Sequence, residues 1–299
     1  MTTTQAWSRG ALGQDAHRSL SAFQESLPVY LIATPRSDFK TCLPHEALSD
    51  VVERHRADAF DFLPVMGVET RGGETIAGVL EVTPFFREVP PKQSVRDCMQ
   101  LLCEQHLIGA DASILTFIRD ADRHPFRFVV SGREINGLVS VSDLQRLPVR
   151  AALFAMVTQL EMAMADVVRR RFPEPDTWRQ KLSQGRAQKV QQKIASATSE
   201  DTLVDQILYT QFCDKVTIIS KAGICSSNEA SNRTSFGKDM KDIENLRNNL
   251  AHANDYAATR DTARHVCECV RKMDEWIRFL AEWGLGQTEA ASRFPSERD

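Results

Sequence analysis

One stretch decides the fold of the first half of this 299-residue chain: Phe126-Arg127-Phe128-Val129-Val130-Ser131-Gly132-Arg133-Glu134-Ile135-Asn136-Gly137-Leu138-Val139-Ser140-Val141-Ser142-Asp143-Leu144. Two apolar runs, Phe126–Ser131 and Ile135–Val141, are rich in the aromatic and β-branched residues that strands favour. Between them, Gly132-Arg133-Glu134 supplies the glycine of a tight turn. Asp143–Arg146 then begins a helix. The stretch therefore predicts a β-hairpin that leads directly into a helix.

The same order of elements occurs nearer the start of the chain. Phe62–Met66 and Ile76–Val82 are expected to be paired strands, with a turn at Thr70–Glu74 around Gly72-Gly73. Two copies of one unit, about 50 residues apart, indicate an internal repeat. The other elements expected in this half are helices at Glu46–Arg56 and Ser94–Glu104 and a strand at Ile114–Ile118.

The second half of the chain has a different pattern. From Val149 to Val168, apolar residues recur at intervals of three and four, which predicts a long amphipathic helix. Four more helices are expected at Trp178–Ile194, Thr202–Ser220, Lys238–Ala253 and Arg260–Glu282, with a polar loop over Gly223–Gly237. We therefore predict an α+β protein with a mixed domain over 28–148, an all-helical bundle over 149–284, and flexible tails over 1–27 and 285–299.

The composition is that of an ordinary globular protein. A net charge of −3, with 42% hydrophobic and 26% charged residues, excludes an overall field that would draw the chain to nucleic acid. Seven cysteines, an odd number without a CxxC pair, indicate reduced thiols. We see no secretion signal, and the apolar runs are expected to be too short to cross a membrane, so we expect a cytoplasmic protein. His265, Cys267 and Cys269 lack a second ligand cluster, so we expect no metal site.

Three residues of the opening stretch carry a family resemblance. Gly137, Ser140 and Asp143 have the spacing at which the segment resembles the end of a cystathionine-β-synthase (CBS) domain. The resemblance implies a tandem pair of βαββα-type domains that binds an adenosine nucleotide, such as AMP, ATP or a cyclic nucleotide, between its two copies. In chemical terms, Gly137 permits the close approach of a ligand or a strand, and Ser140 ends a strand where free N–H groups can hold phosphate. Asp143 caps the helix or accepts hydrogen bonds from ribose hydroxyls.

The first copy departs from this pattern. Gly78 matches, but Glu81 and Pro84 stand where a serine and an aspartate are expected. A carboxylate at this position repels phosphate, so we expect one nucleotide site at most, built on the second copy. The alternative is that the three matching residues of the second copy are a strand glycine, a surface hydroxyl and a helix cap, in a pair that only dimerises.

The helical half carries a second short motif. Leu246 is followed by Arg247-Asn248-Asn249-Leu250-Ala251-His252, in which Arg-Asn-x-x-x-His resembles the motif of RNA-cleaving HEPN domains. Leu160-Glu161, in the middle of the first long helix, and Trp178, after its end, agree with that family. The resemblance covers about residues 150–283.

The resemblance implies that RNA is cut without a metal: the 2′-OH attacks its own phosphate, so DNA is inert. His252 suits proton transfer near neutral pH, Arg247 suits the developing oxyanion, and Asn248 suits the orientation of the imidazole or the phosphate. At about 100° per residue, Asn248 and His252 share a helix face and Arg247 lies about 140° away. We therefore expect a homodimer that brings two copies of the motif to one cleft. The alternative is a helix with an exposed arginine and a histidine packed at an interface.

A basic stretch follows the first long helix. The segment from position 169 to 193 contains eight Arg and Lys residues and only two acidic residues, Glu174 and Asp176. The candidates for RNA contact in this stretch are Arg179, Lys181, Arg186 and Lys189. The alternative is a solvated helix face.

Together these motifs predict a metal-independent endoribonuclease that is regulated by nucleotide binding to a CBS pair. The family resemblance suggests a toxin, a phage-defence protein or a stress effector, with or without an antitoxin. The alternative from a different class is a non-catalytic adenosine-nucleotide sensor or dimerisation protein with a HEPN-like binding domain.

Overall fold

The computed structural model of the chain describes residues 19–58, 60–67, 75–88, 92–198, 205–227 and 233–293. Contacts divide the chain into two compact units. Unit 1 comprises Met1–Gln24, Arg150–Tyr256 and Glu268–Asp299, and unit 2 comprises Glu25–Val149 and Ala257–Cys267. Unit 2 combines two sheets with short helices, whereas unit 1 is built from helices, which confirms the predicted α+β class.

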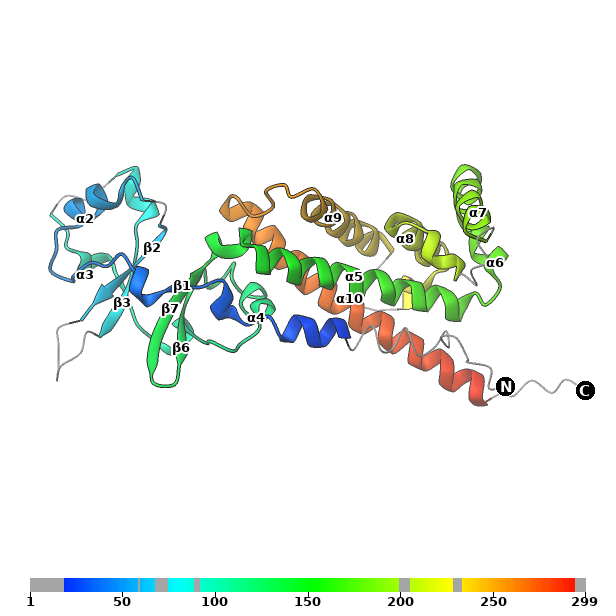
Figure 1. Cartoon of the computed structure of the whole chain (residues 1–299), viewed down its shortest axis with the longest axis horizontal. Helices are drawn as coiled ribbons and strands as arrows, with labels where there is room; N and C mark the ends of the chain where they lie inside the picture. Colours follow the sequence, from blue (N-terminus) through cyan, green and yellow to red (C-terminus); the bar gives the residue numbers. More distant parts are fainter. Residues whose placement is uncertain are drawn as a thin grey trace, which may run out of the picture. The chain divides into compact units, whose positions relative to one another are not determined.

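Unit 2 contains two small β-sheets (Figure 1). Antiparallel pairing joins the two strands of each predicted hairpin, and the turn between them at Gly132 has the positive φ of 62° that glycine tolerates. The other predicted turn, at Thr70–Glu74, lies outside the described residues. The four-stranded sheet has the order β1 (Thr34–Pro35), β7 (Glu134–Ser140), β6 (Phe126–Ser131), β5 (Leu107–Gly109), and the three-stranded sheet has the order β2 (Phe62–Met66), β3 (Ile76–Glu81), β4 (Gln100–Leu101).

The helices of unit 2 are short. A buried apolar cluster packs α2 against β2 and β3, and a second cluster joins the two sheets through Phe62, Phe126 and Phe128. The α-helices are α2 (Leu48–His55), α3 (Val95–Cys98) and α4 (Ile114–Ile118). The 3-10 helices are η1 (Val29–Leu31), η2 (Arg36–Asp38), η3 (Thr83–Phe86), η4 (Glu104–His106) and η5 (Val141–Gln145).

The internal repeat is present but wider than predicted. β2 begins at Phe62 and β6 at Phe126, 64 residues later, and each is preceded by a helix, α2 or α4. Each antiparallel pair is followed by a 3-10 helix, η3 or η5. The predicted spacing of about 50 residues is wrong because α3, β4, η4 and β5 all lie between the two copies.

The segment Ile114–Ile118 forms α4, so its prediction as a strand is wrong. Ser113 caps this helix, because its hydroxyl accepts a hydrogen bond from the Leu115 amide at 3.1 Å. Four of the five residues of α4 are buried, and a short apolar run buried on most sides does not reveal its periodicity.

The segment 94–104 is a second correction. Only Val95–Cys98 is helical, whereas the prediction extended the helix to Glu104. Met99 is extended, with ψ of 151°, and β4 then pairs with β3. Sheet pairing therefore ends the helix after one turn.

Gly78 allows β4 to approach β3. A Cβ atom at this position would lie 2.7 Å from Met99 Cε and press against the Gln100 carbonyl oxygen. We expect Gly78→Ala to lower the free energy of unfolding of unit 2 by about 1–3 kcal/mol, measured by urea denaturation. In the control Gly237→Ala, on α9 (Arg233–Ala251), the new Cβ meets nothing within 4 Å, so stability should stay or rise. An unchanged midpoint for Gly78→Ala would contradict the crowding.

Unit 1 is a helical bundle. Its two longest helices lie side by side, since Arg170 of α5 lies against Gly284 of α10 (Figure 1). Residues 19–25 are also helical. The remaining elements are α5 (Leu147–Arg171), α6 (Pro175–Arg179), α7 (Gln184–Thr198), η6 (Gln206–Tyr209), α8 (Phe212–Lys221), η7 (Ile224–Ser227), α9 and α10 (Arg260–Arg293), whose first turns belong to unit 2.

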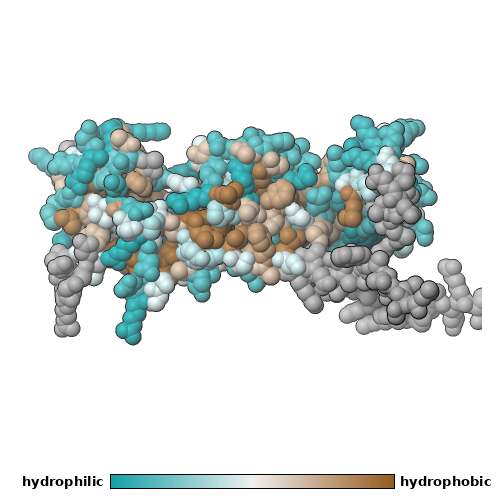
Figure 2. All heavy atoms as spheres, viewed as in Figure 1, coloured by the Kyte–Doolittle hydropathy of each residue, from teal (hydrophilic) through white to brown (hydrophobic). Residues whose placement is uncertain are grey.

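The helix α5 contradicts the expectation that the apolar runs are too short to cross a membrane. With 25 residues and a mean hydropathy of 1.5 over its best window, α5 is long and apolar enough to cross a membrane by length and composition. Of that window, 61% is buried, and core helices of soluble proteins pass the same test. Apolar atoms also reach the surface along the middle of unit 1 (Figure 2), and Phe154 of α5 is 46% exposed.

Two predicted helices of unit 1 are divided. Trp178–Ile194 forms α6 and α7, with a break between them, and the described part of Thr202–Ser220 forms η6 and α8. A capping box between Gln211 and Asp214 starts α8. Within the predicted loop Gly223–Gly237, the described residues form η7 and the start of α9, and α10 continues past the expected end of the bundle to Arg293.

Candidate functional site

A cavity of about 240 Å³ opens in unit 2 at the end of β7. It lies where three segments meet: the chain around η2, the start of β2, and the link from β7 through η5. Ser140 and Asp143, two of the three residues predicted to bind nucleotide, line it. The lining residues are Thr34, Asp38, Phe39, Lys40, Phe60, Asp61, Phe62, Pro64, Leu138, Ser140, Ser142, Asp143 and Arg146.

Asp143 organises one wall of the cavity. Its carboxylate accepts hydrogen bonds from the Ser140 amide at 2.7 Å and the Ser140 hydroxyl at 3.3 Å, in a capping box that begins η5. It also pairs with Arg146 Nε at 2.7 Å. Burial raises the pKa of Asp143, and the bonds from Ser140 and Arg146 partly oppose this rise. The predicted cap is therefore present, and it fixes both neighbours beside the cavity.

Arg146 and Lys40 supply positive charge. The Arg146 side chain is 44% exposed and also donates a hydrogen bond to the Thr34 hydroxyl at 3.4 Å. A guanidinium has five N–H donors, so Arg146 keeps donors for a ligand after these two contacts.

Carboxylates and aromatic rings complete the lining. Asp61 accepts hydrogen bonds from the Thr83 hydroxyl at 2.8 Å and from the Ser142 hydroxyl. Asp38, Asp61 and Asp143 give three negative charges against the two positive charges of Lys40 and Arg146, a net formal charge of −1. The net charge of the lining therefore does not by itself favour the binding of an anion. Phe39, Phe60 and Phe62 add aromatic surface that sequence reasoning did not single out.

Gly137 has a different role from its two predicted partners. It is absent from the lining of this cavity, and its backbone pairs with Pro35 of β1. A Cβ atom here would lie 3.0 Å from the Thr34 oxygen and 3.1 Å from Ala33 Cβ. Gly137 therefore admits a neighbouring strand, as Gly78 does in the first copy.

The first copy lacks the corresponding features. Glu81 ends β3 and forms an ion pair with Arg260, which belongs to the part of α10 that packs in unit 2. Pro84 lies within η3. The carboxylate at this position is therefore already paired within the chain.

The Arg-Asn-x-x-x-His motif lies at the end of α9 in unit 1. Arg247 is partly exposed, and its Nε lies 3.9 Å from Glu161 Oε2 of α5. The other oxygen of Glu161 pairs with Lys215 Nζ at 3.0 Å. Lys215 is 3% exposed and also donates to the Thr210 carbonyl at 2.9 Å. Glu161 thus joins Arg247 to a buried lysine, a residue that the sequence pattern did not indicate.

His252 is exposed at the end of α9. Its backbone amide still donates to the Asn248 carbonyl at 3.1 Å, so His252 directly continues the last turn of α9, and both residues are exposed. Ala253, which follows, has a positive φ of 54°. Among the described residues, no hydrogen bond or ion pair joins the side chains of Arg247 and His252.

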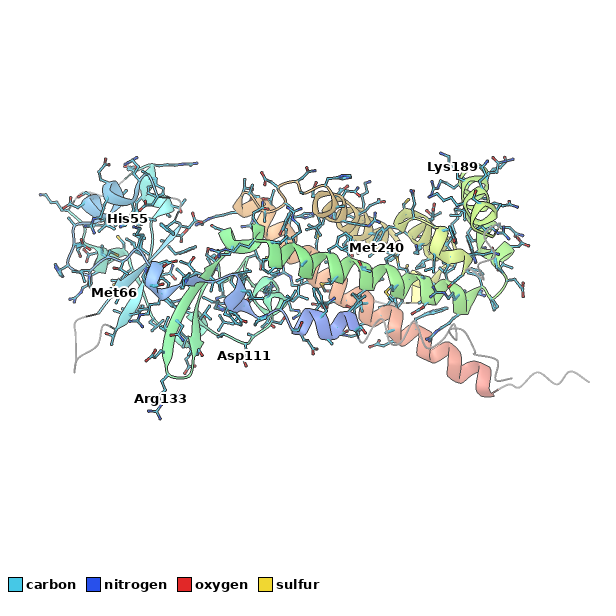
Figure 3. The ribbon with its side chains drawn as sticks, viewed as in Figure 1. His55, Met66, Asp111, Arg133, Lys189 and Met240 are labelled. Atoms are coloured by element: carbon cyan, nitrogen blue, oxygen red, sulfur yellow. The ribbon has the colours of Figure 1, made fainter. Side chains whose placement is uncertain are left out.

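Two of the four candidate RNA-binding residues in the basic stretch form ion pairs within the chain. Arg179 pairs with Asp176, and Arg186 forms a two-pronged bond with Asp214 at 2.9 and 2.5 Å. Lys189 points away from α7 (Figure 3) and is exposed. A cavity of about 670 Å³ brings Arg186 and Lys189 together with Lys193 and Tyr209, whereas Arg179 and Lys181 do not line it.

No protein-family model matches the chain. No curated protein matches it either. Solved structures do: the chain is similar to structures of CBS domains over a little less than half its length.

Three of these structures illustrate the match. The CBS domain of a bacterial CNNM/CorC family Mg2+ transporter, in complex with ATP, is 17% identical, over 44% of this chain and 93% of that chain, with a TM-score of 0.35. A hemolysin-like CBS protein of Oenococcus oeni PSU is 12% identical, over 43% and 94%, with a TM-score of 0.34. The CBS domain of a membrane protein from Sphaerobacter thermophilus is 17% identical, over 45% and 95%, with a TM-score of 0.33.

Proposed function

We propose that unit 2 is a CBS pair that binds one adenosine nucleotide or nucleoside in the cavity beside Ser140 and Asp143. One observation carries this proposal: a strand-end hydroxyl, a buried carboxylate, a partly exposed guanidinium and aromatic rings line the same cavity. An adenine ring stacks on aromatic surface, and ribose hydroxyls donate to a carboxylate such as Asp143. A phosphate accepts from the Ser140 hydroxyl and from Arg146.

The size and charge of the cavity favour a small ligand. Its volume of about 240 Å³ lies below the roughly 300–1,000 Å³ usual for drug-sized ligands. The net formal charge of −1 opposes a triphosphate more than a monophosphate. The proposal is therefore adenosine or AMP in preference to ATP.

Isothermal titration of the full chain with adenosine, AMP, ATP and GMP tests this proposal. We expect adenosine and AMP to bind at least about tenfold more tightly than ATP, a difference of roughly 1.4 kcal/mol. Equal binding of GMP and AMP would remove the preference for adenine, and no binding of any adenine compound would refute the proposal.

The pKa of Asp143 gives this binding a pH dependence. Because burial raises that pKa, Asp143 takes up a proton at a higher pH than an ordinary aspartate, whose pKa is about 3.9. The protonated carboxyl is a weaker acceptor for the ribose hydroxyls, so we expect the affinity for adenosine, which has no phosphate to titrate, to fall as the pH drops through the pKa of Asp143. Adenosine titrations across acid pH check this, and an equal fall in Asp143→Asn would contradict it.

The stability of the free chain has the opposite pH dependence. A carboxyl whose pKa is raised by folding favours the folded state fully below the pKa of the unfolded chain. That contribution is lost as the pH rises through the folded-state pKa. Ligand binding and folding therefore respond to Asp143 with opposite signs.

For unit 1, we propose that the motif at the end of α9 cuts RNA without a metal. The observation that favours it is that Asn248, on the last turn of α9, and His252, directly after it, are both exposed, with Arg247 partly exposed beside them. RNA supplies the nucleophile through its 2′-OH, His252 moves a proton, and the Arg247 guanidinium stabilises the developing negative charge. No hydrogen bond or ion pair joins the side chains of Arg247 and His252 within the described residues. We therefore expect a composite site in which Arg247 of one protomer works with His252 of the other. The exposed Phe154 of α5 is apolar surface that such a homodimer would cover.

The chain itself supplies a route for regulation. Ser140, Asp143 and Arg146 line the cavity, and α5 begins directly after Arg146. Arg150, four residues later, contacts the end of α9. We propose that occupancy of the cavity acts on the motif through this continuous segment. The rival function, a nucleotide sensor with a helical binding domain, keeps the first proposal and removes only the RNA cleavage.

A further inference from the structure

The turn after α9 has an alanine where the backbone is left-handed. The Asn254 amide donates to the Asn249 carbonyl at 3.0 Å, and Ala253 between them has a φ of 54°. This arrangement is a common way to end a helix, with glycine usually at the left-handed position. An alanine stays in that conformation only when its surroundings hold it there.

Arg150 of α5 holds this turn in place through hydrogen bonds. Its Nη1 donates to the carbonyls of Asn249 at 3.2 Å and Leu250 at 2.9 Å, and its Nη2 donates to the Asn254 carbonyl at 2.9 Å. Its guanidinium also lies 5.0 Å from the centre of the Tyr256 ring. One planar, five-donor group thus binds both sides of the turn, at the helix end where positive charge is favourable.

His252 lies inside this turn. Its side chain is exposed, and no hydrogen bond from another described residue fixes the imidazole. The position of the ring therefore depends on the backbone from Asn249 to Asn254. That backbone is the part that Arg150 binds.

We infer that Arg150 is a positioning residue for His252, which it places by holding the turn after α9. This inference rests on the proposed ribonuclease function for its catalytic meaning, whereas the contact itself is independent of it. A displacement of about 1 Å in a catalytic group can lower a rate by about a hundredfold, so the turn has to be held closely.

The test compares Arg150→Lys with the control Arg171→Lys in the full chain. Lysine keeps the charge but cannot bind three carbonyls in one plane. Arg171 ends the same helix and stacks on Phe172, outside the α9 turn. Amide hydrogen exchange of Asn254 reports the turn, an NMR pH titration of His252 reports the imidazole, and kcat and KM on RNA report the reaction.

In Arg150→Lys we expect Asn254 exchange to accelerate at least about tenfold, the His252 resonances to shift, and kcat to fall by about 10- to 100-fold with little change in KM. Arg171→Lys should match the wild type in all three. Unchanged exchange in Arg150→Lys overturns the inference, and so does faster exchange with full kcat. If the wild type cuts no RNA but exchange still accelerates, the ribonuclease proposal fails while the hold on the turn stands.

A second variant covers the case in which Arg150→Lys does not fold. Ala253→Gly relieves the left-handed alanine, so Ala253→Gly/Arg150→Lys should fold. Relative to Ala253→Gly alone, the double variant should show the same faster exchange and lower kcat. Equal values for these two variants would overturn the inference.

Discussion

Asp143→Asn is expected to weaken AMP binding by about 10- to 100-fold, the loss that follows from removing charged hydrogen bonds of about 1.5–3 kcal/mol. Asparagine keeps the shape of the side chain but not its charge. It cannot pair with Arg146, so the guanidinium loses the contact that holds it beside the cavity at 2.7 Å. It also offers a ribose hydroxyl a neutral acceptor in place of a carboxylate. Isothermal titration with AMP measures the effect.

Asp97→Asn is the matched control for this experiment. Asp97 also forms a capping box, with the Ser94 amide and hydroxyl both at 2.8 Å, but it does not line the cavity. Both variants therefore lose a charged cap within unit 2, and only Asp143→Asn loses a cavity residue. We expect AMP affinity to remain unchanged in Asp97→Asn. An equal loss in both variants would show that a folding defect, not the cavity, explains it.

His252→Ala is expected to lower RNA cleavage by at least about 100-fold, the lower end of what general acid–base catalysis contributes. The assay uses total RNA with EDTA, and a DNA strand of the same sequence should remain intact because it has no 2′-OH. The products should carry a 2′,3′-cyclic phosphate and a 5′-OH. His252 is exposed, so its removal should leave the melting temperature of unit 1 nearly unchanged.

His45→Ala is the control for the cleavage assay. His45 is an exposed histidine of unit 2, outside the motif and the cavity lining. The His45→Ala variant should cut RNA at the wild-type rate. Cleavage that persists in His252→Ala would come from another nuclease or another site, and it would refute the role given to the motif.

Local patterns predicted part of unit 2 correctly. The strands around Gly132 and the cap formed by Asp143 follow from residues within a few positions of one another. Ser140 and Asp143 are predicted together from the resemblance to the end of a CBS domain, and the capping box that joins them in the structure has the same spacing of three residues. By contrast, α4 has nearly all of its residues buried, so its periodicity is hidden, and it was mistaken for a strand.

Contacts between distant segments could not be predicted. Phe39 and Phe60 reach the cavity from segments some 80 or more residues before Asp143, and no local pattern links them. Arg150 and the Leu250 carbonyl are 100 residues apart. Lys215 lies among the buried apolar residues of α8, and only the structure reveals that Glu161 compensates its charge. These residues complete the sites, and each depends on tertiary packing.

Photolabelling of the full chain with 8-azido-AMP, followed by peptide mapping, tests most directly whether the cavity beside Asp143 binds an adenosine nucleotide. We expect label on peptides that contain the cavity segments 34–40, 60–64 or 138–146, and we expect this label to be competed by unlabelled AMP and weakened in Asp143→Asn. Label confined to other peptides, or label that excess AMP does not reduce, would contradict it.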